Sequence, residues 1–285
     1  MNNRKTPSCR FSDPAGRILA VVMLSLVCAV TSAQGRLELL PVQNRSVSAF
    51  SLGIGSAASL DTYLSPCEYS GAYLACDYDC MSLGSGDGLF PYRHLYLNLG
   101  YGFLKNHSGS MNASDVMVHA YGSWSHELVS SGIWESLLGI SALGDLGAVM
   151  NMANTNNPVN AKFQMSSGAT FDNIVHFRVK NRPMAVKGTL YLPLLGVSFA
   201  PDHDQFYWNM QAEGGLSGDF HIVTPFNAQT MSAQFALDIP VCGRVVQIGY
   251  GMYLMRHRLG GNFSGLWHSY ATVGFVHRFE RLKWK

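Results

Sequence analysis

The sequence carries little charge and no excess of either sign. Asp, Glu, Lys and Arg make up only 13% of its 285 residues, and the formal net charge is +2. Four of the 20 basic and one of the 18 acidic residues lie within the first 33, so the rest of the chain has a net charge of −1. Nucleic-acid binding requires a basic field. The composition therefore argues against a nucleic-acid partner.

The mean hydropathy is also low, at +0.07. A helical membrane protein would be more hydrophobic than this. The value nevertheless coexists with 47% hydrophobic residues and 29 glycines. Alternation of apolar and polar positions produces such an average, as in a transmembrane β-barrel.

Cysteines are few, and two of the six lie in the first 33 residues. Cys67, Cys76 and Cys80 are close in sequence, and Cys242 is remote. Because the protein is expected to be exported, a disulfide among the first three is plausible, with its pairing open. No histidine lies near them, so a metal site is not expected.

Residues 1–33 resemble a secretory signal. Arg4, Lys5, Arg10 and Arg17 form a positive region, residues 18–30 an apolar core, and Thr31-Ser32-Ala33 a cleavage site. The core is too short to span a bilayer. We therefore predict a signal peptide over 1–33 and one structural domain over 34–285.

The clearest structural pattern lies between Met231 and Phe279. Apolar residues alternate with small or polar ones on both sides of Cys242-Gly243, which is strand periodicity around a two-residue turn. The turn predicts four facing pairs: Ile239 with Val246, Leu237 with Ile248, Phe235 with Tyr250, and Asp238 with Gln247. One face of this hairpin is apolar and the other polar.

The same alternation recurs along the chain. Residues 91–104 place Leu95, Leu97, Leu99, Tyr101 and Phe103 on one face, against His94, Tyr96, Asn98, Gly100 and Gly102 on the other. We count eleven such strands, including one near Trp208–Glu213, or twelve if residues 35–43 add another. The predicted fold is all-β: a closed antiparallel transmembrane β-barrel of about twelve strands, with ten as runner-up if residues 67–77 form a loop.

Several segments resemble an uncharacterised family of small outer-membrane proteins from anaerobic gut bacteria, built on a domain of unknown function. The matching residues are Asp61-Thr62-Tyr63-Leu64-Ser65-Pro66, Glu68-Tyr69-Ser70-Gly71, Pro193-Leu194-Leu195-Gly196-Val197-Ser198-Phe199, Leu237-Asp238-Ile239-Pro240 and Ile248-Gly249-Tyr250. Cys67 stands where the family pattern has an apolar residue. The resemblance implies a barrel and no particular activity.

Polar strand faces should point into the barrel. The lumen candidates are Asp115, His119, Asp145, Asp172, His176, Arg178, Lys187, Asp238 and Gln247, with Glu135, Lys180 and Glu213 on the same faces. Both signs occur in similar numbers, which argues against strong ion selectivity and favours a salt-bridged, filled lumen. Asp172 and His176 lie about 13 Å apart on one strand, too far to share a metal. No metal or cofactor is expected.

Two other functions are weighed against a structural barrel or a narrow, weakly selective passage. A lipid-modifying barrel enzyme needs a serine beside a histidine on one face. Every His–Ser neighbour here, such as His268-Ser269, falls on opposite faces or in a turn, so no catalytic residue is assigned and the protein is not expected to be an enzyme. A secreted β-sandwich would instead pack its apolar faces together.

We therefore predict a monomeric protein of the bacterial outer membrane. Its partners would be membrane lipid and the barrel-assembly machinery, the latter through the terminal strand that ends at Phe279.

Overall fold

The computed structural model describes residues 45–83, 89–154, 157–180, 182–202, 216–242 and 244–280. All of them belong to one compact unit, 39–285. The predicted signal segment, the candidate strand at 35–43 and the one near Trp208–Glu213 lie outside the described residues.

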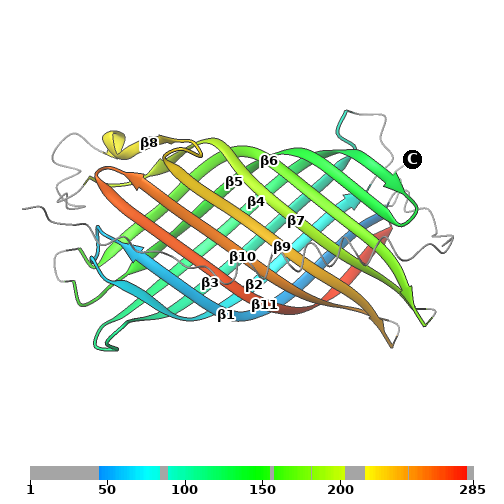
Figure 1. Ribbon diagram of the computed structural model, residues 1–285, viewed down its shortest axis with the longest axis horizontal. Helices are drawn as coiled ribbons and strands as arrows, with labels where there is room; N and C mark the ends of the chain where they lie inside the picture. Colours follow the sequence, from blue (N-terminus) through cyan, green and yellow to red (C-terminus); the bar gives the residue numbers. More distant parts are fainter. Residues whose placement is uncertain are drawn as a thin grey trace, which may run out of the picture. The chain divides into compact units, whose positions relative to one another are not determined.

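The described residues form a closed antiparallel β-barrel (Figure 1). One sheet of eleven strands runs in the order β6-β5-β4-β3-β2-β1-β11-β10-β9-β7-β8, and an additional β6–β7 pairing closes it. The barrel strands are β1 (Arg45–Asp61), β2 (Glu68–Leu83), β3 (Tyr92–Asn106), β4 (Asn112–Ser131), β5 (Trp134–Met150), β6 (Val159–Val179), β7 (Arg182–Phe199), β9 (Ala228–Val241), β10 (Arg244–Leu259) and β11 (Asn262–Glu280).

The short strand β8 (Phe220–Val223) follows the 3-10 helix η1 (Leu216–Asp219) and pairs with the last residues of β7. β7 pairs with β9 over Ala185–Tyr191 and with β8 over Gly196–Phe199. Figure 1 shows β8 at the same end of the barrel as the β10–β11 turn, whereas the last residues of β11 lie at the other end. We call these the β8 end and the terminal end.

The prediction of twelve strands is wrong, because the ring among the described residues closes with ten. β1 pairs directly with both β2 and β11, and β7 pairs directly with β9. No place is left between these partners for a further strand. The runner-up count is therefore right, although its reason was not: β2 (Glu68–Leu83) covers most of the segment 67–77 that it treated as a loop.

The alternation predicted for β3 is confirmed. His94, Tyr96, Asn98, Gly100 and Gly102 are buried, while the residues between them are exposed. Small and polar side chains thus face the lumen, and large apolar ones face outward: Leu95, Leu97, Leu99, Tyr101 and Phe103.

The register of the β9–β10 hairpin is also confirmed. The four predicted pairs occur, and Val241 faces Arg244 across the two-residue turn. Cys242 in that turn has φ 48°, a left-handed conformation that hairpin turns of this length require. Such short turns match the right-handed twist of the strands that they join.

Two other possibilities that the sequence raised are not found. The alternative of a β-sandwich is wrong, because the apolar faces lie on the outside of a single closed sheet. Cys67, Cys76, Cys80 and Cys242 are all free, so the plausible disulfide is absent from the described residues. In the same residues we find no helix with the length and apolar character to cross a membrane.

Candidate functional site: the barrel lumen

Aromatic and histidine side chains fill the middle of the lumen. We define the lumen plug as Tyr73, Tyr96, Tyr121, Tyr191, Tyr253, Tyr270, His119 and His268, all of them buried. They come from β2, β3, β4, β7, β10 and β11, at the inward positions of the alternation. Large rings reach the centre of a narrow barrel, where smaller side chains would leave a gap.

Hydrogen bonds cross the lumen between strands that are not neighbours. The Tyr253 hydroxyl donates to Asp145 Oδ2 at 2.7 Å, joining β10 to β5. The Tyr96 and Tyr270 hydroxyl oxygens lie 2.9 Å apart and join β3 to β11. These bonds connect parts of the wall that are not adjacent in the sheet, so the plug also braces the barrel.

Two histidine–aspartate pairs lie within the plug. His119 Nδ1 is 2.8 Å from Asp145 Oδ1, and His268 Nε2 is 2.8 Å from Asp115 Oδ2. The His119 ring stacks on Tyr253 with centroids 3.7 Å apart, and the His268 ring stacks on Tyr73 at 4.3 Å. Each imidazole is therefore held by two contacts: a tyrosine ring stacks on its face, and a carboxylate oxygen contacts one of its ring nitrogens.

A third histidine, His94, lies between two carboxylates. Its Nε2 is 2.7 Å from Asp79 Oδ1, and its Nδ1 is 3.2 Å from Asp172 Oδ1. Thr189 also donates a 2.7 Å hydrogen bond to Asp172. A doubly protonated imidazolium satisfies this arrangement, because both ring nitrogens then donate to carboxylate oxygens.

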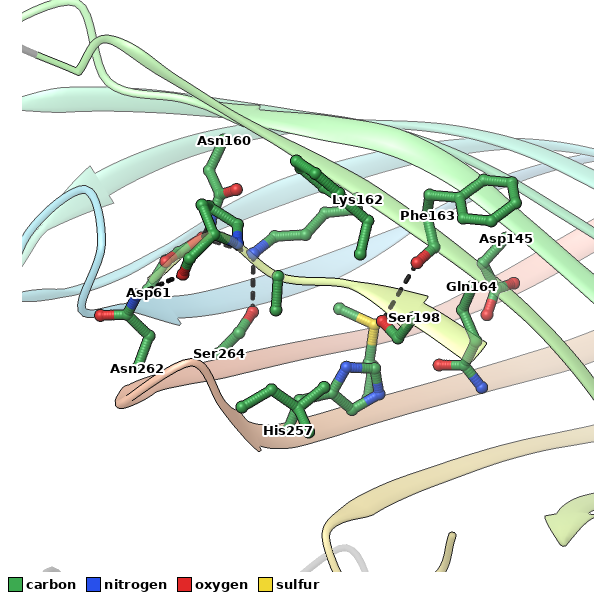
Figure 2. Close-up of a pocket in the computed structure, with 15 residues that line it drawn as sticks. Asp61, Asp145, Asn160, Lys162, Phe163, Gln164, Ser198, His257, Asn262 and Ser264 are labelled. Carbon is green, nitrogen blue, oxygen red and sulfur yellow. Dashed lines mark hydrogen bonds and ion pairs between the residues drawn. The ribbon is translucent and has the colours of Figure 1, made fainter. Parts of the chain in front are cut away.

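A small cavity lies toward the β8 end, where Leu259 and Asn262 on either side of the β10–β11 turn contribute to its lining. Figure 2 shows the residues around it. Lys162 extends from β6 and places Nζ 2.6 Å from Asp61 Oδ2 and 2.8 Å from Ser264 Oγ. Asn160 donates to the same Asp61 oxygen at 2.8 Å. β1 and β6 are on opposite sides of the ring, so this ion pair spans the lumen. The cavity beside it measures about 20 Å³, room for about one water molecule.

A second cavity, of about 40 Å³, lies on the other side of the plug. Asp77, Asp79 and Lys187 line it. Lys187 Nζ is 2.8 Å from Asp238 Oδ2, and Gln247 donates to Asp238 Oδ1 at 2.9 Å. Both cavities are far smaller than a channel for hydrated ions, and the plug lies between them.

The predicted lumen candidates occupy different environments. The structure brings His119 and Asp145 together, and likewise Lys187, Asp238 and Gln247. Asp115 pairs with His268, and Asp172 with His94. His176 is half-buried, with Nε2 3.5 Å from Glu135 Oε1. Arg178 and Lys180 are exposed at the terminal end, beside the β6–β7 turn, and Glu213 lies outside the described residues.

Sequence reasoning missed His94, His268 and Lys162 as site residues. His94 and His268 follow the inward alternation of their strands, which was the signal available for both. His268 was considered only as a partner for Ser269. Lys162 stands near the start of β6, and it is buried at an inward position of that strand.

Carboxylates outnumber permanent cations in the lumen. Lys162 and Lys187 are the inward lysines of the described residues, against seven inward aspartates: Asp61, Asp77, Asp79, Asp115, Asp145, Asp172 and Asp238. The balanced mixture expected from the sequence relied partly on Arg178 and Lys180. Histidines are therefore the groups that contact most of these carboxylates.

In the described part of the chain, no group of three or more His, Cys, Asp or Glu could hold a metal ion.

Gly100 makes room for the plug. A Cβ atom at this position would lie 1.7 Å from the Tyr73 hydroxyl oxygen. Gly100→Ala should displace Tyr73 and lower the free energy of unfolding by about 1–3 kcal/mol. Urea unfolding of the refolded protein, followed by tryptophan fluorescence, measures this loss. Gly122→Ala is the control, because nothing lies within 4 Å of its Cβ. Equal losses in the two variants would contradict the assignment.

Comparison with solved structures finds the translocator domain of the autotransporter NalP from Neisseria meningitidis. The similarity has a TM-score of 0.34 and 11% sequence identity, and it covers 93% of this chain and 97% of that chain. No curated protein matches the chain. The model of a family described as "Protein of unknown function (DUF3316)" matches residues 19–285. This agrees with the resemblance to an uncharacterised family, and the chain therefore belongs to the DUF3316 family.

Proposed function

We propose that the protein is an integral β-barrel of the bacterial outer membrane whose own side chains close its lumen, and that its role there is structural rather than catalytic or diffusive. Of the two roles that the sequence leaves open, a filled lumen favours the structural one over a narrow passage. Origin in anaerobic gut bacteria is part of this proposal and derives from the family resemblance alone.

The outward face of β3 is the observation that carries the membrane location. Its five outward apolar residues, from Leu95 to Phe103, are all exposed, with Arg93 at one end and Lys105 at the other. This apolar stretch covers nine residues, the length that a tilted strand needs to cross a bilayer. In water, such an exposed row of Leu, Tyr and Phe would be unfavourable.

The outward face of β10 repeats this arrangement. Outward apolar residues run from Val246 to Leu254, again over nine residues, with Arg244 before them and Arg256 after them. β3 and β10 are separated by β2, β1 and β11, so the two bands lie on different parts of the wall. A continuous apolar belt between charged rims is the exterior of a membrane barrel.

The plug supports the closed state. Its cross-lumen bonds join non-neighbouring strands, and the cavities of about 20 and 40 Å³ lie on either side of it. A diffusive pore needs a continuous water-filled path. We therefore expect the barrel not to conduct ions.

The absence of catalysis is likewise part of the proposal. Ser269 follows His268 but lies on the outer face, where its hydroxyl contacts the Tyr250 hydroxyl at 2.5 Å. His268 points into the lumen toward Asp115.

The proposal also includes the oligomeric state and the route of assembly. We expect a monomer that the assembly machinery inserts through β11, the strand whose Phe279 pairs with Ser46 in the backbone register.

Conductance across a planar bilayer tests the closed lumen. The refolded protein should co-float with phospholipid vesicles and show a heat-dependent shift in gel mobility, but it should give no stepwise current in molar KCl. A steady current would overturn the closed lumen. Failure to co-float with any vesicle would overturn the membrane location.

A further inference from the structure

Two arginines stand together on the outside of the barrel at the β8 end. Arg256 and Arg258 are both exposed on the outward face of β10. They are two residues apart, so both side chains leave the strand on the same side. They begin where the apolar band of β10 ends, after Leu254.

One aromatic ring lies beneath both guanidinium groups. The Phe263 centroid is 5.6 Å from Arg256 Cζ and 5.9 Å from Arg258 Cζ. Phe263 is directly opposite Arg258, and Gly265 is opposite Arg256. A Cβ on Gly265 would lie 3.2 Å from Phe263 Cε1. Glycine at this position therefore lets the Phe263 ring extend along β11, over Gly265, toward Arg256.

Within the described part of the chain, neither guanidinium group forms an ion pair with an acidic side chain. The outward neighbour of Arg256 on β9 is the neutral Gln229. Cation–π contacts orient a guanidinium but leave its N–H donors available. Two oriented guanidinium groups with free donors suit a phosphate group.

The position of Arg256 and Arg258 relative to the apolar belt indicates that a phosphate bound there would belong to a membrane lipid. Trp267 pairs with Leu254, the last apolar residue of the β10 band, and lies on the same outward face. Tryptophan is enriched at the boundary between acyl chains and headgroups. Arg256 and Arg258 lie just beyond that boundary, at the level of the headgroups.

We propose that Arg256, Arg258 and Phe263 form a binding site for the phosphate of an anionic membrane lipid, in the leaflet at the β8 end. The guanidinium groups bind the phosphate, Phe263 holds them side by side, and the acyl chains lie along the outward face of β10. This inference rests on the proposed membrane location and adds the class of lipid that the barrel prefers.

Mass spectrometry of intact protein–lipid complexes tests the site. The protein is released from micelles that contain equal amounts of phosphatidylglycerol and phosphatidylcholine. Wild-type protein should retain phosphatidylglycerol preferentially. Arg256→Gln with Arg258→Gln should lower that retention about tenfold, because each basic residue at a membrane surface contributes substantially to anionic-lipid binding. Phe263→Leu should lower it by about threefold, through loss of the cation–π contacts.

The matched control removes two cations that are not adjacent. Arg93→Gln with Lys105→Gln changes net charge equally, but these residues lie at opposite ends of the β3 band. This variant should change retention by less than about twofold. An equal fall in phosphatidylglycerol retention in both double variants would show that retention depends on net charge alone, and it would overturn the site. Displacement of the lipid by millimolar inorganic phosphate would overturn a lipid site in favour of a phosphate site.

Flotation separates this inference from the proposed function. If wild-type protein co-floats with vesicles but retains both lipids equally, the headgroup site is wrong and the membrane location stands. If it fails to co-float, the membrane location itself is wrong.

Discussion

Replacing His94 by leucine should lower the free energy of unfolding by about 3–5 kcal/mol, the usual cost of leaving a buried charge without its partner. His94 lies between Asp79 and Asp172, at 2.7 and 3.2 Å. Leucine fills much of the volume but donates no hydrogen bond, so the two carboxylates would face each other in the lumen. Asp172 Oδ2 already has no partner within the described structure. Urea unfolding in micelles, followed by tryptophan fluorescence, measures the loss.

His107→Leu is the matched control, because His107 is exposed in the β3–β4 turn. It should change the stability by less than about 0.5 kcal/mol. Adding Asp172→Asn to His94→Leu should recover part of the loss, since an amide does not need a cation. A loss below 1 kcal/mol for His94→Leu alone, or no recovery in the double variant, would contradict the charge-based account of this cluster.

The local structure of the barrel could be predicted from the sequence because alternation and turn length are local properties. A two-residue turn at Cys242 fixes the register of β9 against β10, and every predicted pair followed from that single choice. The inward and outward faces of β3 followed from a period of two. Neither inference needs information about distant strands.

The number of strands could not be obtained in this way, because closure depends on distant pairings. β7 pairs directly with β9, which follows it by 28 intervening residues. Alternation near Trp208–Glu213 gave no sign of whether that segment belonged between them. The disulfide expectation failed for a related reason. Cys76 and Cys80 lie on one strand about 13 Å apart, and closeness in sequence had been taken for closeness in space, whereas a disulfide needs Cα atoms within about 7 Å.

The sequence also could not show which inward residues meet across the lumen. His268 and Asp115 are 153 residues apart and come from strands that are not neighbours. Strand tilt and stagger bring them to one level, and no single strand encodes either quantity. The sequence could therefore indicate most of the inward positions but not the pairs that form between strands far apart in the sheet.

The second large effect is expected on the outside of the barrel, at the centre of the apolar band of β3. Leu99→Arg should lower the free energy of unfolding in phospholipid vesicles by about 2–4 kcal/mol, because an arginine at the bilayer midplane must displace lipid or draw in water. Leu99 is the middle of the five outward apolar residues of this strand. Urea unfolding of the vesicle-inserted protein, followed by tryptophan fluorescence, measures the change.

Leu95→Arg provides a control that differs only in depth. Leu95 and Leu99 are the same residue type, share one face of β3, and are both 52% exposed. Leu95, however, is next to Arg93 on that face, where an arginine can reach the headgroups, so its substitution should cost about 0–1 kcal/mol. Each substitution should remove a similar amount of side-chain packing from the outer surface of the barrel. The difference between the two losses of unfolding free energy therefore reports whether lipid or water surrounds each position. If water surrounded the barrel, both substitutions would change stability by about 0.5 kcal/mol or less. Equal and small effects in vesicles would contradict the membrane location, whereas a larger loss at Leu99 would locate the centre of the bilayer on the strand.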